Sequence, residues 1–443
     1  MSRTRKPSTK AKKIIERLDR VVASSNKVSF YPLVVKEGHD CTVTDIDGNT
    51  YLDFNASWTT AGVGYSNPEV VKAIEEELEQ STGLASLCRH ANVKTVEFAE
   101  MLVGLTPGNF KKKVWIGHSG SDACAAAYKL LPLATKKDRV LTFYGGYYGS
   151  DLAGMAMGGH PMSVQFKVPG LVAKVPYAYC YRWPFGLEYP SCGVFCASEF
   201  IENQTFKYVA PPDDTSFMMV EAIQGDSGDI VPPERYLQKL QRTCRKYGIS
   251  FCVDECKTGF GRTGKMFAVE HEDSVIPDVM ALGKSIASGF PVGALVGRRE
   301  LMDTGLTLTT LSGNSIGAAA GLATMQVIRK KKLVDNAYRQ GRYLRKRLDE
   351  LKERHDMIGD VRGKGLFFGI ELVKDRKTKE PARKETAEVA LRAWQLGLII
   401  AYMGADFNVL EITPPLTIDE SQIDHGIEIL DNALTYVAKS RAR

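Results

Sequence analysis

The chain has 443 residues, of which 44% are apolar and 25% charged, and its formal net charge is +6. This length can bury a full core and predicts more than one domain. No apolar run is long enough to span a membrane, and the first residues, MSRTRKPSTKAKK, lack the apolar stretch of a secretory signal. We therefore expect a cytoplasmic protein with no membrane partner.

Three kinds of element are predicted before residue 81. Residues 1–25 form a basic tail or helix, and residues 28–56 contain short strands with a turn. A helix is expected over 67–80, because Asn67 suits the N-cap and Pro68 the first turn.

The basic N-terminal segment has two interpretations. It could be an arm that binds nucleic acid or a membrane, or a solvated and frayed tail. No aromatic residue is interleaved with its charges, and no second basic block follows. These features favour the tail, so we expect no nucleic-acid partner.

From about residue 94, short apolar runs alternate with amphipathic helices. The runs are KVWIG, RVLTFYG, SFMMVEAI, ISFCVDE, DVMALG and GALVG, and the helices include SDACAAAYKLLPLAT and ERYLQKLQRTCRKYG. Continuous apolar runs between helices predict the α/β class, with a mostly parallel sheet covered on both faces. Ligands bind beyond the carboxyl ends of such strands, and here these ends carry GHSGSD, YGGYYG, EAIQGD, DECKTG and LGKS.

A long helix, roughly 313–331, leads out of this region. The remainder is predicted as helix, strand (GLFFGIELV), helix, strand (LGLIIAYM), strand (NVLEITP) and helix. This is a smaller α+β domain, and we expect the N-terminal strands to pack with it. The predicted division is therefore a large domain over 81–334 and a small domain from 26–80 and 335–443.

Nine dispersed cysteines indicate buried thiols. Cys180, Cys192 and Cys196 form the one cluster. A zinc site needs four ligands, and no histidine lies near these three, so we predict no metal. A disulfide from Cys180 is a second alternative, and a plain loop is favoured over both.

Four features point to a pyridoxal phosphate site. Lys284 follows an apolar strand and is partly withdrawn from water, and a neutral lysine amine can form a Schiff base with an aldehyde. Asp254 ends a neighbouring strand, where a carboxylate could hold a proton on a pyridinium nitrogen. The segment SGSD (119–122) opens a helix that could receive a phosphate, and Tyr147 could stack on a flat ring. Taken alone, Lys284 would be interpreted as a lysine reaching from a strand end to solvent.

With these motifs the chain resembles the class III aminotransferases, a fold-type I pyridoxal-phosphate family. The resemblance runs from about residue 28 to 437. The matching stretches include DIDGNTYLDF, GHSGSDA, FYGGYYG, VEAIQGD, VDECKTGFGRTGKMFA, DVMALGKSIASGFPVGALVG, LTTLSGN, IGDVRGKGLFFGIEL and ITPPLTI.

The resemblance implies pyridoxal 5'-phosphate as cofactor and a homodimer, with further pairing into a tetramer left open. It implies that the active sites lie at the dimer interface. The roles that it implies are Schiff-base lysine for Lys284, ring-nitrogen partner for Asp254, phosphate contacts for Gly120 and Ser121, ring stacking for Tyr147, and a phosphate contact from the other subunit for Thr310.

Two positions depart from the aminotransferase pattern. Lys257 replaces the family's usual glutamine, which hydrogen-bonds the ring hydroxyl, and Glu411 replaces the usual arginine, which binds a substrate carboxylate. The α-amino-ε-caprolactam racemases are similar in both departures. Their second acid/base pair, an aspartate and a lysine, matches Asp226 and Lys257 here.

A racemase must deliver a proton to the face of the α-carbon opposite the one from which a proton was removed. Lys284 cannot easily serve both faces, so a second proton donor must reach the far face. Lys257 and Asp226 are the candidates, and their mutual pairing would make burial tolerable. Lys257 could instead only replace the glutamine's hydrogen bond to the ring hydroxyl.

The residue type at position 411 affects which substrates the site can accept. In the family the arginine at this position pairs with a glutamate that matches Glu221, and two facing glutamates would repel unless one is protonated or a cation separates them. This arrangement disfavours an anionic co-substrate and suits an amide, a lactam or a basic side chain. Trp58 could wall an apolar pocket or belong to the core, and Arg362 is interpreted as structural rather than as a carboxylate binder.

The sequence therefore predicts a racemase or epimerase dependent on pyridoxal phosphate and acting on an amino acid or aminolactam. An aminotransferase of ω- or α-amino acids on the same scaffold is the alternative. A non-catalytic, nucleotide-binding α/β protein is disfavoured, because no G-x-G-x-x-G follows an early strand.

Overall fold

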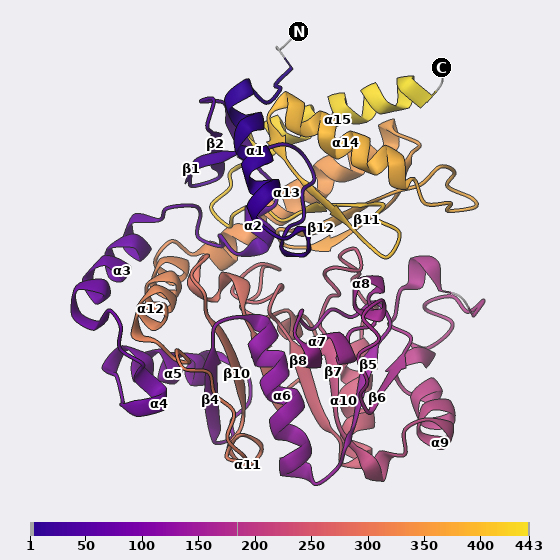
Figure 1. The fold of residues 1–443 in the computed structure, drawn as a ribbon. Helices are drawn as coiled ribbons and strands as arrows, with labels where there is room; N and C mark the ends of the chain where they lie inside the picture. Colours follow the sequence, from indigo (N-terminus) through magenta and orange to yellow (C-terminus); the bar gives the residue numbers. More distant parts are fainter. Residues whose placement is uncertain (1–3, 184, 442–443) are drawn as a thin grey trace.

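Three sheets organise the residues that the computed structural model describes, which are 4–183 and 185–441 (Figure 1). The largest has seven strands, in the order β4 (Lys112–Gly117), β10 (Gly293–Arg298), β9 (Val279–Leu282), β8 (Ser250–Asp254), β7 (Thr215–Glu221), β5 (Arg139–Phe143) and β6 (Val172–Val175). Strand β10 is antiparallel to both of its neighbours, and the other pairs are parallel. The predicted mostly parallel sheet is confirmed.

Helices cover both faces of this sheet, which explains its continuous apolar runs. Along β7, Phe217 and Met219 pack in one cluster with residues of helix α6, whereas Met218 and Val220 pack in another with residues of α10. The longer helices are α1 (Thr9–Val21), α3 (Pro68–Ser81), α5 (Val93–Leu105), α6 (Gly120–Thr135), α10 (Tyr236–Tyr247), α12 (Ser315–Lys330), α13 (Leu333–Arg354), α14 (Arg383–Leu396) and α15 (Glu420–Arg441). The shorter ones are α2 (Ala56–Thr59), α4 (Ser86–Arg89), α7 (Leu152–Met157), α8 (Pro161–Val164), α9 (Phe206–Tyr208) and α11 (Arg299–Met302).

The two smaller sheets join the ends of the chain. One has the order β1 (Val35–His39), β2 (Thr42–Asp45), β3 (Thr50–Asp53) and β13 (Leu398–Ile399), and the other β11 (Ile358–Lys364), β12 (Phe367–Leu372), β15 (Val409–Ile412) and β14 (Ala401–Met403). Strand β13 pairs in parallel with β3, so the N-terminal strands do pack with the C-terminal segment. The domain boundaries themselves stay a prediction.

Three details differ from the sequence-based expectations. The run LGLIIAYM is not one strand, because β13 and β14 on either side of Ile400 belong to different sheets. Strands β6 and β11 were not predicted. From residue 4 onward the N-terminal segment is ordered against the domain, not frayed: Ser8 caps α1, and the Arg5 guanidinium lies 4.6 Å from the Tyr51 ring centroid; residues 1–3 lie outside the described residues.

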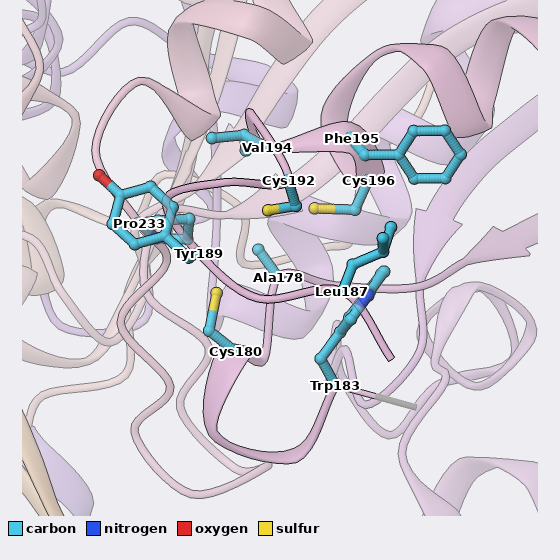
Figure 2. Close-up of a pocket in the computed structure, with 10 residues that line it drawn as sticks. All are labelled: Ala178, Cys180, Trp183, Leu187, Tyr189, Cys192, Val194, Phe195, Cys196 and Pro233. Carbon is cyan, nitrogen blue, oxygen red and sulfur yellow. The ribbon is translucent and has the colours of Figure 1, made fainter. Parts of the chain in front are cut away.

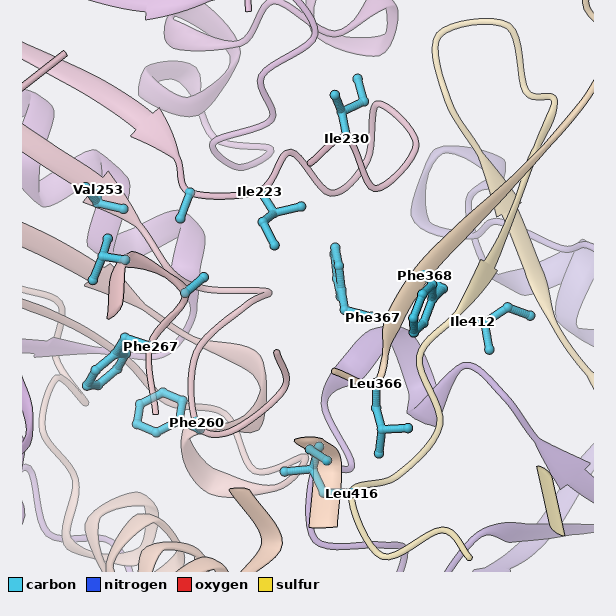
Figure 3. Close-up of a cluster of buried hydrophobic side chains, with 14 of the residues drawn as sticks. Ile223, Ile230, Val253, Phe260, Phe267, Leu366, Phe367, Phe368, Ile412 and Leu416 are labelled. Atoms are coloured by element: carbon cyan, nitrogen blue, oxygen red, sulfur yellow. The ribbon is translucent and has the colours of Figure 1, made fainter. Parts of the chain in front are cut away.

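A buried cluster lies where the large sheet meets the C-terminal strands, and it positions the loop after β8 (Figure 3). Phe260 and Phe267 follow β8, whereas Phe367 and Ile412 belong to β12 and β15. The loop that carries Lys257 is therefore held between two parts of the chain that are far apart in the sequence. Among the described residues, no helix is long and apolar enough to cross a membrane.

Candidate active site

The carboxyl ends of three neighbouring strands open into one pocket. Glu221 ends β7, Asp254 ends β8 directly beside it, and Lys284 follows β9 after one glycine. The pocket is lined by Tyr147, Glu221, Ile223, Asp226, Asp254, Cys256, Lys257, Thr258 and Lys284. The structure therefore brings together six of the residues singled out from the sequence, at the predicted edge of the sheet.

Asp254 and Lys284 face the pocket from adjacent strands. Lys284 opens a short 3₁₀ helix with a φ of +46°, a left-handed conformation that a non-glycine residue rarely adopts. The Asp254 carboxylate accepts hydrogen bonds from the Cys256 N–H (2.8 Å) and the Cys124 thiol (3.3 Å). Burial raises the pKa of Asp254, and the Cys256 N–H and the Lys284 charge oppose that rise. A cationic partner at this carboxylate would favour its ionised form further.

The start of helix α6 has backbone N–H groups of the kind that bind anions. Ser119 is the N-cap, and its hydroxyl accepts the Asp122 N–H. The N–H groups of Gly120 and Ser121 lie in the first turn, where they have no partner within the helix. A Cβ on Gly120 would lie 2.6 Å from the Cys256 sulfur, so only glycine allows this close approach.

Glu221 holds the loop that carries Tyr147. Its carboxylate accepts the N–H groups of Tyr147 (3.1 Å) and Gly225 (2.9 Å). Burial, followed by the charge of Asp254, raises the pKa of Glu221 to about 8. This carboxyl is therefore largely protonated at neutral pH in the absence of a ligand.

Lys257 lies at the centre of a buried acidic cluster. Its amine is 3.2 Å from Asp226 and 3.9 Å from Asp229, and it forms an ion pair with Glu411. It also contacts the Met403 sulfur at 3.3 Å. Lys257, Asp229 and Glu411 are buried, whereas the Asp226 side chain is 33% exposed.

The charges of this cluster keep the proton on the amine. Burial alone would lower the pKa of Lys257, but Glu411, Asp226 and Asp229 together raise it above its usual value. The pKa of Asp226 is lowered, because Lys257 and Lys284 outweigh the effect of burial. Burial and the nearby Glu411 raise the pKa of Asp229 well above normal, and its oxygens accept no hydrogen bond from the described residues. Asp226 is thus an ionised carboxylate in direct contact with the Lys257 amine.

Asn55 connects this cluster to a strained turn, and the sequence reasoning missed it. Its side-chain amide donates to Glu411 (2.9 Å), and its side-chain oxygen accepts the Trp58 N–H (2.7 Å). Residues 56–59 all have positive φ, from 48° to 65°, at a cost of roughly 1–2 kcal/mol per residue. The Thr59 carbonyl accepts the hydroxyl of Ser285, the neighbour of Lys284. The turn of residues 55–59 therefore contacts both Glu411, the partner of Lys257, and Ser285, which follows Lys284 in the chain.

The two glutamates expected to face each other have separate partners. Glu221 binds backbone N–H groups, whereas Glu411 binds Lys257 and Asn55. The cation that neutralises Glu411 is therefore Lys257. Arg362 is structural as predicted: it pairs with Glu371 (2.7 Å) and donates to the Gly228 carbonyl (2.8 Å), so it fixes the loop of Asp226.

Trp58 and Thr310 are not among the described residues that line the pocket. Trp58 is 42% exposed and lies edge-on to Phe30 at 6.2 Å, so it is not a core residue. Thr310 is exposed, and its carbonyl accepts the Cys88 thiol. A contact from Thr310 to the phosphate of another subunit stays a prediction.

The three clustered cysteines line a separate pocket (Figure 2). Cys180, Cys192 and Cys196 are all free thiols, so the Cys180 disulfide is not formed. Burial raises the pKa of Cys196 to about 12, which makes its thiolate scarce. Trp183, Leu187 and Phe195 line the same pocket and make it apolar.

Comparison with known proteins identifies the family. The sequence profile of the aminotransferase class-III family matches residues 22–434. The chain belongs to the class III aminotransferase family. It is 39% identical to the leucine/methionine racemase of Thermococcus litoralis (97% of this chain, 96% of that protein) and 37% identical to the isoleucine 2-epimerase of Lentilactobacillus buchneri (97% and 95%). A transaminase structure from the marine bacterium Virgibacillus aligns with a TM-score of 0.88 at 27% identity, covering 97% of this chain and 99% of that one.

Members of this family depend on pyridoxal 5'-phosphate, and the site fits it. Lys284 offers an amine, Asp254 a buried carboxylate, and the start of α6 backbone N–H groups for a phosphate; Gly120 lets this turn pack closely on Cys256, whose sulfur an added Cβ would meet. The cofactor and the fold-type I architecture agree with the sequence-based prediction.

Replacing Glu221 by glutamine is expected to flatten the pH dependence of apoenzyme stability. The folded-state pKa of about 8 lies above the ordinary 4.5, so the stabilising contribution is complete below about pH 4.5 and is lost as the pH rises to 8. The wild-type melting temperature should fall more steeply over this range than that of Glu221→Gln. Thermal melts at constant ionic strength measure this, with the exposed Glu79→Gln as control, and equal slopes would contradict the expectation.

Proposed function

We propose that the protein is a pyridoxal-phosphate-dependent racemase or epimerase that inverts the α-carbon of an amino acid or aminolactam by two-base proton transfer. The observation that carries the proposal is a second amine, that of Lys257, in the same pocket as Lys284. Its 3.2 Å contact with Asp226 provides an acid/base pair. When bound, the cofactor withdraws electrons from the α-carbon and makes its C–H bond acidic.

We assign roles to six side chains in and beside the pocket. Lys284 holds the cofactor aldehyde and moves a proton at one face of the α-carbon. Lys257 moves a proton at the other face: its ammonium gives the proton to the α-carbon and becomes a neutral amine, and the Asp226 carboxylate stabilises the ammonium before transfer. Asp254 holds the proton on the ring nitrogen, and Glu411 with Asn55 orients Lys257.

We propose a substrate with a neutral side chain. Glu411 is fully buried and its charge is balanced by Lys257, so it offers no free anion to a basic substrate. No arginine stands there to bind a second carboxylate. The racemase and the epimerase reported above are named for leucine, methionine and isoleucine, which agrees with this class.

The test is incubation of one enantiomer with the holoenzyme and no keto acid. In D₂O, a two-base racemase converts L-leucine into its mirror image with solvent deuterium at the α-carbon, and no keto acid accumulates. Chiral chromatography with mass spectrometry measures both. Turnover that starts only when a keto acid is added would overturn the proposal.

The same experiment examines the alternative, an aminotransferase of ω- or α-amino acids. Family membership and the likeness to a transaminase structure favour this reading. The pairing of Lys257 with Glu411 weighs against it, because an ion pair occupies the place where the resemblance puts the carboxylate-binding arginine.

We further propose a cytoplasmic homodimer whose interface includes the loop of Thr310. Leu306 (87% exposed), Leu308 and Leu311 leave this loop apolar, and it packs against Leu87 of α4. Such a patch on a surface indicates a contact with another chain. The nine cysteines, all within the described residues, are free, which suits a reducing compartment.

The double variant Leu306→Asp, Leu311→Asp is expected to shift the dimer toward monomers and to weaken cofactor binding by more than about tenfold. Thr310→Ala should keep the dimer and weaken cofactor binding alone. Sedimentation velocity and cofactor titration measure these effects. Leu171→Asp, on the edge of the sheet remote from β4, is the control. An unchanged dimer in the double variant would exclude this interface.

A further inference from the structure

Three metal-ligating side chains surround the carboxylate that serves the cofactor ring. Cys124 comes from α6, Asp254 ends β8, and Cys256 follows two residues later. Their ligand atoms all lie within 4.8 Å of one another, and all three residues are at most 9% exposed. The Cys124 sulfur is 3.3 Å from one Asp254 oxygen. Two sulfurs and a carboxylate are a donor set that zinc binds.

The spacing needs little adjustment. Zinc–sulfur bonds of about 2.3 Å in tetrahedral geometry place ligand atoms about 3.8 Å apart, so each atom has to move by less than about 1 Å. Asp254 and Cys256 also line the pocket, which provides an entry path and room for a water as fourth ligand. The other oxygen of Asp254 is already held by the Cys256 N–H, so the carboxylate is oriented in advance.

Charge and protons balance when the metal binds. Each thiol releases one proton to solvent, and two thiolates, one carboxylate and Zn²⁺ leave a net charge of −1. Lys284 lines the same pocket as Asp254 and Cys256, so its amine is placed to compensate this charge when it carries a proton. The same carboxylate is assigned above to the cofactor's ring nitrogen.

We propose that Cys124, Asp254 and Cys256 form a zinc site of the apoenzyme, and that zinc and pyridoxal phosphate exclude each other there. The mutual exclusion rests on the proposed role of Asp254, whereas zinc binding itself does not. The site would make loading of the cofactor sensitive to free zinc.

Zinc content tests the binding. Apoenzyme and holoenzyme are incubated with ZnCl₂, passed through a desalting column and analysed for metal. The apoenzyme is expected to retain one more zinc per chain than the holoenzyme. Cys124→Ala and Cys256→Val should lose that extra ion, and Cys256→Ser replaces the valine variant if its melting temperature falls. The double variant Cys180→Ser, Cys192→Ser, which leaves Cys196 as the one cysteine of the separate pocket, should retain it. Equal retention by Cys124→Ala and wild type would overturn the proposal.

Cofactor uptake tests the exclusion. Zinc should slow the rise of the cofactor's protein-bound absorbance at least about fivefold in wild-type apoenzyme, and a chelator should restore the rate. The Cys124→Ala apoenzyme should be unaffected. Equal slowing in that variant would mean that zinc acts on the cofactor in solution, which would overturn the exclusion. None of these readouts depends on racemisation, so they stand apart from the proposed function.

Discussion

Replacing Lys284 by alanine is expected to abolish racemisation, with a loss of at least about 10³-fold. The amine is the group that bonds the cofactor aldehyde and moves the proton at one face. No other described amine in the pocket can take its place, because Lys257 is held by Asp226 and Glu411. The internal Schiff base should disappear with the activity.

Absorbance spectra and borohydride reduction followed by mass spectrometry measure this bond. Wild type should carry the reduced cofactor on Lys284, and Lys284→Ala should carry none. Lys174→Ala is the matched control, because Lys174 is a partly buried lysine of β6 that donates to the Ala156 carbonyl outside the pocket. A Lys284→Ala enzyme that still reduces onto the chain, or still racemises, would contradict the assignment.

Lys257→Gln is expected to slow racemisation by roughly 10²–10⁴-fold, the usual contribution of a general acid or base. Glutamine can still hydrogen-bond the cofactor's ring hydroxyl but can supply no proton. The cofactor should stay bound, and half-transamination, which needs only Lys284, should slow by less than about tenfold. The ratio of the two rates in one sample does not depend on how much protein is folded.

The substitution has a second effect that needs its own control. Without Lys257, Glu411 is buried and unpaired, and breaking such a pair costs about 3–5 kcal/mol. The double variant Lys257→Gln, Glu411→Gln should recover much of the lost melting temperature and none of the racemisation. If both reactions fall equally in Lys257→Gln, the lysine only holds the ring. Recovery of racemisation in the double variant would equally exclude it as a proton donor.

Much of the fold could be predicted because local patterns and tertiary packing agree. Six apolar runs became strands of the large sheet, and α3 begins where Asn67 and Pro68 predict. The sequence-based prediction fails for segments whose structure depends on a neighbouring strand. VAKV of β6 has only four residues and includes a lysine, which is too little pattern to predict a strand, and it becomes a strand because β5 lies beside it. The residues around Ile400 form two strands because β13 pairs with β3 of one sheet, whereas β14 pairs with β15 of another.

The site shows the same division. Lys284, Asp254 and the start of α6 could be found from the sequence, because strand ends of an α/β sheet converge whatever the side chains are. Asn55 and Asp229 could not, since their only local signal is a polar residue after a strand or in a loop. Asn55 meets Glu411, 356 residues away in the chain, only because β15 lies beside that turn.

Residue types and their order along the chain predicted the α/β architecture and a pyridoxal phosphate site at the strand ends, because periodicity and strand-end position are local properties. The two departures at Lys257 and Glu411 came from the resemblance to the class III aminotransferases. Tertiary structure alone decided which charge balances which. Ion pairing depends on distances of a few ångströms in a buried setting, and long-range packing brought Lys257, rather than Glu221, to Glu411.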